Sequence, residues 1–334
     1  MIFFAILAAT IISYIFFKIH VANYDKNPES NVYDKYYVMI TDNYKSDFWQ
    51  AVYKSAFEEA KAENIYLDLM GEKLTNAHTV EELMRMAIAS HVDGIIVYAN
   101  EQTGMTRLIN EAEEKGIPVV TLYGDNTHSK RISFVGVGSF DIGRKYGRQV
   151  IDIINEKKQK TDGKGKVQIS VLVNTEMQDP AQNIIVLAIK ETVKQLNAEN
   201  TDFIINTVPV ENQNPYSAEE TIRDLFLQDE IPDVMICLNE LDTVCAYQAV
   251  VDYNRVGDVD ILGYSDSDKI ISAIDRGVIY STISIDTTQM GEYCVDALND
   301  FYNFGETSEY YISDIELINR ENAAEYSAKE SADE

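Results

Sequence analysis

The feature that most constrains the fold is a regular alternation of short apolar runs with amphipathic segments. The runs are rich in residues typical of strands and lie at 36–40, 65–70, 94–99, 118–123, 132–137, 167–173, 203–210, 233–238, 260–264 and 278–284. Between most of them, apolar residues recur at helical spacing, as in 184–196 and 290–301. Almost continuously apolar strands that alternate with helices are typical of parallel sheets covered by helices on both faces. The sequence therefore predicts an α/β fold.

Ten or more strands in about 280 residues are better divided between two sheets than placed in one. A weak internal repeat supports this division. VDGIIVYANEQTGMTRLINEA and PDVMICLNELDTVCAYQAV both contain an acid, an apolar strand, Asn and Glu, and then a helical pattern. We expect two sheets, each with its own helices.

The composition excludes several classes of function. The formal net charge of -27 argues against binding to nucleic acid or to an anionic membrane surface, because no basic stripe is present to neutralise phosphates. The three cysteines (Cys237, Cys245, Cys294) lack the spacing of a metal or redox site, and we expect them to be buried thiols. The four histidines are scattered. The sequence predicts neither a metal site nor a cofactor.

The N-terminus is the most apolar part of the chain. Residues 2–17 are almost wholly apolar, and Lys18 follows them directly. Sixteen residues at about 1.5 Å each are short of an apolar core about 30 Å thick, but apolar residues up to Ala22 extend the segment. A buried helix and a cleaved signal are the alternatives; no small-x-small cleavage site is evident. We predict an uncleaved membrane anchor over 1–22, a polar tether over 23–35, and an acidic, frayed tail over 323–334.

Polar and aromatic side chains gather where the predicted strands end. Ligands of open parallel sheets bind beyond the carboxyl ends of the strands, where helix N-termini also point. Residues at these ends include Asp42, Ser46, Phe48, Trp49, Tyr98, Asn100, Tyr123, Asp125, Asn126, Asp179, Asn212, Asn239, Asp242, Ser265, Asp266 and Asp286. Almost none are Lys or Arg, so an anionic ligand is disfavoured. Amides, carboxylates and aromatic faces suit a neutral, hydroxyl-rich ligand.

Helix capping is the alternative interpretation of several of these residues. Asn239 is a good N-cap, with Asp242 at the third helical position, and Ser46, Ser265 and Asp286 are also suited to capping. We expect Asn239 both to cap its helix and to face the ligand, and Asp242 only to cap. One of the neighbouring rings Phe48 and Trp49 should face the core and the other the ligand.

Enzymatic motifs are missing from the sequence. It contains no GxGxxG after a strand, no GxxxxGK[ST], no GxSxG and no HExxH. Acidic pairs are plentiful only because acids are plentiful, so nothing specific supports a glycosidase. We predict that the protein is not an enzyme.

Six stretches of the chain are similar to a known family. They are YYVMITDNYKSDFWQAVYKSAFEEAK, VDGIIVYANE, GIPVVTLYGD, SFVGVGSFDIGRKYGRQV, DVMICLNELDTVCAYQAV and DILGYSDSDKIISAIDRGVIYSTISIDTTQMGE. Residues 36–319 resemble the type 1 periplasmic binding proteins, specifically the ribose- and galactose-binding group, whose core is shared with lac-repressor-type regulators. The resemblance implies two Rossmann-like lobes joined by three crossovers near Gly138, Ile285 and Asp314. The lobes would comprise 36–138 with 286–313, and 139–285 with 314–322.

The resemblance also implies a set of ligand-binding residues. The family's aromatic pair matches Phe48 and Trp49, with Ser46 before them, and its asparagine matches Asn239. Its aromatic–aspartate after the next strand matches Tyr264 and Ser265, which displaces the acid to Asp266. The full expected set is Ser46, Phe48, Trp49, Tyr98, Tyr123, Asp125, Asp179, Asn183, Asn212, Asn239, Tyr264 and Asp266.

Two charged positions of the family differ in this chain. The aspartate–arginine pair after VVTL becomes Tyr123 and Gly124, with Asp125 one step further along. The arginine of the second lobe falls on Asn183 or an apolar neighbour, with Asp179 near the family's acidic position. Both arginines that clamp a sugar are therefore missing, which favours a different polyol, an oligosaccharide or a modified sugar over an ordinary pentose or hexose.

The resemblance implies a receptor outside the cytoplasm. Its two lobes would close on a sugar or sugar-like neutral ligand, and the protein would deliver that ligand to an ABC importer. The alternative is presentation of the closed state to a membrane histidine kinase or chemosensory partner. The repressor relatives carry a helix-turn-helix where this chain has an apolar segment, so DNA binding is rejected. A glycoside-processing enzyme and a pure interaction module on the same scaffold are the remaining hypotheses.

Overall fold

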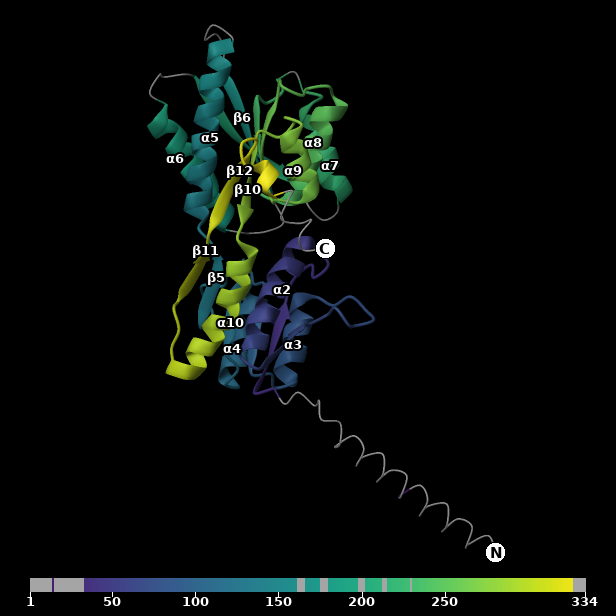
Figure 1. Cartoon of the computed structure of the whole chain (residues 1–334), viewed down its shortest axis with the longest axis vertical. Coiled ribbons are helices and arrows are strands. Elements are labelled where there is room, and N and C mark those ends of the chain that lie inside the picture. Colours follow the sequence, from purple (N-terminus) through teal and green to yellow (C-terminus); the bar gives the residue numbers. More distant parts are fainter. Residues whose placement is uncertain are drawn as a thin grey trace, which may run out of the picture.

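The computed structural model describes residue 14 and residues 33–160, 166–174, 180–197, 202–211, 215–228 and 230–326. Its strands form two six-stranded sheets. The first has the order β11-β5-β4-β3-β1-β2, and the second β12-β10-β9-β8-β6-β7. Each sheet belongs to its own lobe, one above the other along the long axis of the molecule (Figure 1). The prediction of a two-lobed α/β fold is confirmed.

The first sheet is wholly parallel. Its strands are β1 (Lys35–Ile40), β2 (Ile65–Leu69), β3 (Gly94–Val97), β4 (Val119–Leu122), β5 (Ser133–Val137) and β11 (Tyr310–Ser313). Helices α2 (Asp47–Ala62) and α10 (Thr287–Phe304) pack with one face of the sheet. Helices α3 (Val80–Ala89) and α4 (Thr103–Glu114) pack with the other. Successive residues of β1 alternate between these two cores, as the side-chain alternation of a strand requires.

The second sheet is parallel except at one edge. Its strands are β6 (Val167–Asn174), β7 (Phe203–Val210), β8 (Val234–Ile236), β9 (Asp260–Tyr264), β10 (Ser281–Ile285) and β12 (Ile315–Asn319). Strand β12 runs antiparallel to β10, so the prediction of purely parallel sheets is wrong at this strand. The reason is that the chain passes from β11 of the first sheet into β12 of the second after one residue. No helical crossover lies between them to reverse the chain, so β12 does not run in the direction of its neighbour.

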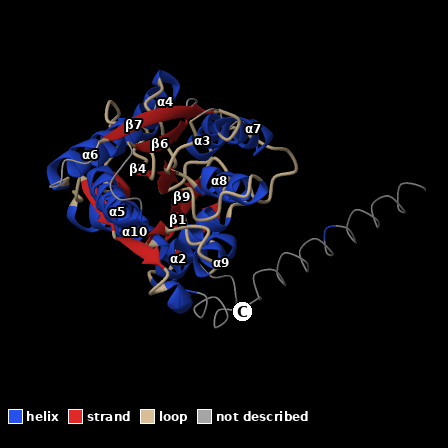
Figure 2. Ribbon diagram, turned by 90° about the horizontal axis from the view of Figure 1, so that it is seen from above, coloured by secondary structure: helices blue, strands red, loops and turns tan. Residues whose placement is uncertain are grey.

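In the described part of the second lobe, five helices cover the two faces of the sheet. Helices α5 (Ser139–Lys160) and α6 (Pro180–Leu196) pack with one face, and α7 (Pro215–Leu225), α8 (Glu240–Asp252) and α9 (Asp268–Asp275) with the other. Viewed along the long axis, the helices lie outside the strands (Figure 2). Cys237 and Cys245 are buried in this lobe, and Cys294 is buried on α10 of the first lobe, as the sequence predicts.

The chain changes sheet at three places. It leaves the first sheet after β5, returns after β10, and leaves again between β11 and β12, where only Asp314 separates the strands. These places coincide with Gly138, Ile285 and Asp314. The exact division of the chain into lobes stays a prediction.

Four predicted strands end earlier than the sequence indicates. They end at Leu69, Val97, Leu122 and Ile236 rather than at 70, 99, 123 and 238. The apolar runs continue because Tyr98, Ala99, Cys237 and Leu238 are buried just beyond the strand ends, where the N–H groups of Tyr98 and Cys237 still donate to Ile40 O and Leu262 O, both at 2.9 Å. Apart from residue 14, the predicted anchor lies outside the described residues, as do the tether up to residue 32 and the tail from residue 327. The prediction of a frayed tail is wrong for residues 323–326, which are helical, because Ala323 is buried in the core of the second lobe. Within the described part of the chain, no helix is long and apolar enough to span a membrane.

Candidate functional site

The first side of the candidate site begins where β1 runs into α2. Ser46 is the N-cap of α2, and its hydroxyl accepts a hydrogen bond from the Trp49 backbone N–H at 3.4 Å. The Trp49 indole Nε1 donates to Asp42 Oδ1 at 2.8 Å, and its ring is buried. Phe48, the next ring, is only half-buried. The prediction that one ring of this pair faces the core is confirmed, and that ring is Trp49.

Four aromatic rings from three strand ends pack together. The ring centroids of Trp49 lie 4.9 Å from Phe48, 5.7 Å from Tyr98 and 5.9 Å from Tyr123, all in edge-on geometry. Phe48 and Tyr123 are 5.2 Å apart. Edge-to-face contacts of this kind are favourable beyond the area they bury. The candidate site of the first lobe therefore contains a packed aromatic cluster, which we define as Phe48, Trp49, Tyr98 and Tyr123.

The backbone after β4 takes a shape that the sequence does not predict. Tyr123 has a φ of +63°, in the left-handed region that non-glycine residues rarely adopt. Gly124 follows, and its N–H donates to Leu122 O at 2.7 Å. A Cβ on Gly124 would lie 2.2 Å from the carbonyl oxygen of Ala99, so no side chain fits there. The arginine that the family places at Gly124 has no room in this backbone.

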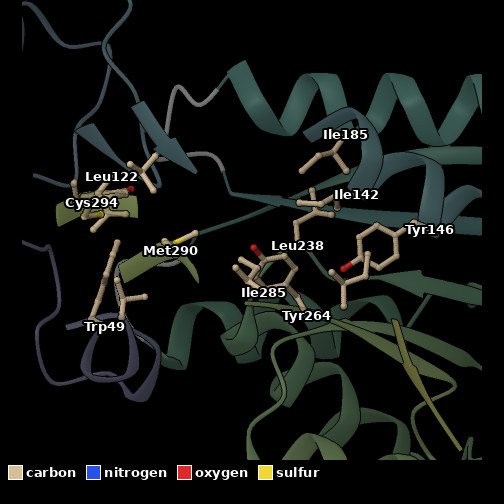
Figure 3. Packing of buried hydrophobic residues seen from close by; sticks show 14 of the residues in the cluster. Trp49, Leu122, Ile142, Tyr146, Ile185, Leu238, Tyr264, Ile285, Met290 and Cys294 are labelled. Carbon is tan, nitrogen blue, oxygen red and sulfur yellow. The ribbon is translucent and has the colours of Figure 1, made fainter. Parts of the chain in front are cut away.

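The second side of the site begins at the end of β9. Tyr264 is 8% exposed and lies beside Leu238 and Ile285, the residues at the ends of β8 and β10 (Figure 3). Its backbone N–H donates to Thr243 Oγ1 at 3.0 Å, and the same hydroxyl lies 2.7 Å from Asn239 O. Thr243 thus ties α8 to the end of β9, a role for which the sequence carries no signal.

The two sides of the site meet at one polar contact. The Tyr123 and Tyr264 hydroxyl oxygens are 2.9 Å apart and share a hydrogen bond. Trp49, Tyr98, Leu238, Tyr264 and Ile285 also belong to one continuous apolar cluster that reaches from the first lobe to the second. The structure therefore brings the aromatic cluster and Tyr264 together.

Asn239 caps α8 as predicted. Its side-chain oxygen accepts from the Asp242 N–H at 2.8 Å, and its amide nitrogen donates to Asp242 Oδ2 at 2.7 Å. Asp286 caps α10 in the same way, through the Gln289 N–H. Ser265 does not cap α9, whose N-cap is Ser267, so that expectation is wrong. Ser265 instead forms a sharp turn with a φ of +85° after Tyr264.

Two predicted acids have partners within the protein. Asp125 forms a two-point ion pair with Arg131, with Nε–Oδ1 and Nη2–Oδ2 distances of 2.5 and 2.8 Å. It also accepts from the Thr121 hydroxyl and the Asn126 N–H, both at 2.7 Å. Asp266 accepts from the Ser284 hydroxyl at 2.6 Å. These contacts favour a structural role for Asp125, and its contact with a ligand stays a prediction.

The remaining predicted residues are less informative. Asn183 is exposed on the first turn of α6. Asp179 and Asn212 lie outside the described residues. A pocket of about 480 Å³ lies to one side of the predicted set, on the first lobe. It is lined by Tyr44, Lys45, Gln50, Glu72, Leu74, Thr75, Asn76 and Ala77.

The electrostatics of the site are those of an acidic, apolar environment. Burial raises the pKa of the Asp42 carboxyl, although the residue keeps exposed surface, and the Trp49 hydrogen bond partly offsets this effect. Burial also raises the pKa of the Cys237 thiol, with the nearby Asp242 carboxylate adding to it, so Cys237 is not a reactive thiolate. In the described ranges, no group of three or more His, Cys, Asp or Glu side chains is placed to hold a metal ion.

A two-lobed chain with paired α/β sheets and a site at their facing strand ends is a periplasmic-binding-protein fold. The chain belongs to the family of the periplasmic binding protein domain, whose model matches residues 37–307. The resemblance seen in the sequence is thereby confirmed. Membership of this family implies an extracytoplasmic location. A comparison with curated protein sequences finds no match.

Solved structures show the same fold. GanP, a glucose-galactose binding protein from Geobacillus stearothermophilus, is 21% identical with a TM-score of 0.74, over 86% of this chain and 98% of GanP. AraP, an arabinose binding protein from the same organism, is 20% identical with a TM-score of 0.69, over 88% of this chain and 99% of AraP. The XylFII-LytSN complex contains a chain that is 25% identical with a TM-score of 0.68, over 86% of this chain and 98% of that one.

Proposed function

We propose that this protein is a non-enzymatic receptor that binds a sugar or sugar-like neutral ligand between its lobes. The observation that carries the proposal is the meeting of the aromatic cluster of the first lobe with Tyr264 of the second at the ends of their sheets. A ligand held there contacts both lobes, and so favours the form in which they are closed.

The chemistry of these side chains suits hydroxyl-rich molecules. Aromatic faces cover the C–H surfaces of a sugar ring, while phenol, amide and carboxylate groups donate to or accept from its hydroxyls. Among the predicted ligand residues none is Lys or Arg. Arg131, which contacts Asp125 of this set, is neutralised by that ion pair. A ligand without a negative charge is therefore favoured.

The liganded form has two candidate membrane partners, an importer and a sensor. We propose delivery to an ABC importer, with the N-terminal apolar segment, on the strength of its sequence, as a tether to the membrane. The second candidate is presentation of the closed state to a membrane sensor. The observation in its favour is that XylFII, which shares this fold at 25% identity, is found in a complex with LytSN.

A thermal-shift screen of the full chain tests the proposed function. The chain is kept in a detergent without a sugar headgroup, such as an amine oxide, and is presented with neutral pentoses, hexoses, polyols, disaccharides and charged sugar acids. We expect one neutral class to give a saturable rise in melting temperature, and the sugar acids to give none. The absence of a shift with every neutral carbohydrate would contradict the proposal, as would chemical conversion of the ligand during long incubation.

A pair of variants shows whether binding occurs at the aromatic cluster. Phe48→Ala removes a half-buried ring of the cluster and should abolish most of the ligand-induced shift. Phe304→Ala removes a ring that is 75% exposed at the end of α10, away from the sheet ends, and should leave the shift unchanged. Equal ligand responses in the two variants would place the ligand elsewhere.

A further inference from the structure

A direct polar contact between the lobes involves two tyrosines that lie 141 residues apart in the sequence. Tyr123 follows β4 of the first sheet, and Tyr264 ends β9 of the second. Their hydroxyl oxygens are 2.9 Å apart, an ordinary length for an O–H···O hydrogen bond. A bond that joins two protein groups across the lobes contributes to the equilibrium between open and closed forms whether or not a ligand is bound.

The Tyr123 side of this bond is fixed by the backbone and by ring packing. Its N–H donates to Val135 O at 2.8 Å, while its φ of +63° turns the chain into the tight bend at Gly124. Its ring meets Phe48 and Trp49 edge-on, with centroids 5.2 and 5.9 Å away. A left-handed conformation in a residue with a large side chain persists only where surrounding contacts hold it.

The Tyr264 side is fixed equally well. The Tyr264 backbone N–H donates to Thr243 Oγ1 at 3.0 Å. Ser265 fixes the turn that follows: its N–H donates to Ile283 O, and its carbonyl accepts from the Thr282 hydroxyl. The Tyr264 side chain is 8% exposed. Two preorganised phenols therefore meet in a largely apolar environment, where a hydrogen bond loses little to competition from water.

We propose that Tyr123 and Tyr264 form a latch between the lobes: because their hydrogen bond joins two protein groups, it favours the closed form even when no ligand is bound. Without such a bond, two lobes are expected to move relative to each other. Beside Tyr123, Gly124 leaves no room for a side chain at the bend. The latch goes beyond the proposed function, because it does not depend on which ligand is bound.

Distances between the lobes test the latch. Spin labels are attached to the exposed positions Asn76→Cys in the first lobe and Lys269→Cys in the second, since the native cysteines are buried. Pulsed electron paramagnetic resonance then reports the closed and open distances of the full chain, shown to be ligand-free by native mass spectrometry. We expect mainly the closed distance in the otherwise unchanged protein.

Removal of either hydroxyl should open the lobes. Tyr123→Phe and Tyr264→Phe should each raise the open-to-closed ratio about two- to tenfold, the range that corresponds to one net hydrogen bond. The double variant should open no further than the single ones, because both remove the same bond. Tyr53→Phe is the matched control: its hydroxyl donates to Leu67 O at 3.1 Å within the first lobe. This control should not change the distances.

Three results would overturn the proposal. One is an unchanged distance distribution in both Phe variants, and another is equal opening in Tyr53→Phe. The third is additive opening in the double variant. None of these results concerns sugar binding, so failure of the latch and failure of the proposed function are separable. Circular dichroism of each variant confirms that a change in distance is not caused by unfolding.

Discussion

At the residue scale, Asn239 carries two roles that a single substitution separates. Asn239→Ala removes the cap of α8 and should lower the free energy of unfolding by about 1 kcal/mol. It also removes an amide at the strand ends, so ligand affinity should fall as well. Urea unfolding and the ligand-induced thermal shift measure the two effects.

A second cap supplies the control for Asn239. Thr79 caps α3 through a capping box with Glu82, on the first lobe and outside the predicted ligand set. Thr79→Ala should cost similar stability while leaving ligand affinity intact. If Asn239→Ala lowers only stability, then Asn239 is a cap and not a ligand contact.

Single residues show how far the sequence predicts the site. The caps at Ser46, Asn239 and Asp286 were predictable, because N-cap preference is a local property of the chain. The pairing of Asp125 with Arg131 was not, because the sequence does not show that the loop between β4 and β5 turns Arg131 back onto the acid. The positive φ of Tyr123 was also not predictable from the sequence, because tertiary contacts impose it.

At the element scale, the packing of α5 against α6 depends on a close approach at Gly143. A Cβ there would lie 2.6 Å from Ile185 O and 2.5 Å from the Ala188 Cβ. Gly143→Ala should therefore destabilise the protein by about 1–3 kcal/mol, the usual cost of overpacking, despite the better helix propensity of alanine. Thermal unfolding measures the loss.

Another helical glycine is the matched control for this substitution. The three atoms nearest to a Cβ on Gly104, in the first turn of α4, all belong to the flexible carboxylate end of Glu81. Gly104→Ala should be neutral or should stabilise the protein by up to about 1 kcal/mol. Destabilisation of the same size at both positions would show that backbone flexibility, and not helix packing, sets the requirement at Gly143.

The elements that the sequence missed are those with the weakest local signal. Strands β11 and β12 have four and five residues, and Tyr310 and Ile312 of β11 are about half exposed. β11 pairs with β5, far away in the sequence. Such edge strands are defined by a distant partner, whereas the central strands, buried on both faces, were evident as apolar runs.

At the scale of the whole molecule, the net charge of -27 makes acidic neighbours unavoidable. Asp296 of α10 is half-buried against α2, and its pKa is raised by burial and by the surrounding acids, of which Glu59 is the strongest. Burial and Glu156 raise the pKa of Asp152 on α5 in the same direction. The charged forms of these carboxyls are thus destabilised in the folded state.

Mild acid should therefore stabilise the protein. A carboxyl with a raised pKa binds its proton at a higher pH in the folded state than in the unfolded state, where an aspartate titrates near about 3.9. In the window above that value the folded state holds more protons, so the free energy of unfolding falls as pH rises and recovers as pH is lowered. The lowered pKa of Glu101, which His128 and Thr127 hold by hydrogen bonds against the effect of burial, acts in the opposite direction.

Urea unfolding between pH 7 and pH 5 measures how the free energy of unfolding depends on pH. Asp296→Asn shows how much of that dependence comes from Asp296. The variant removes one charge that is repelled by Glu59, so its stability at pH 7 should rise and its dependence on pH should be weaker than that of the unchanged chain. Glu58→Gln, an exposed acid on α2, removes the same charge from the molecule without relieving a half-buried group. Salt should act like Asp296→Asn, because it screens the same repulsion. If Glu58→Gln weakens the pH dependence as much as Asp296→Asn does, the cause is the net charge of the whole molecule and not the packing of α10 on α2.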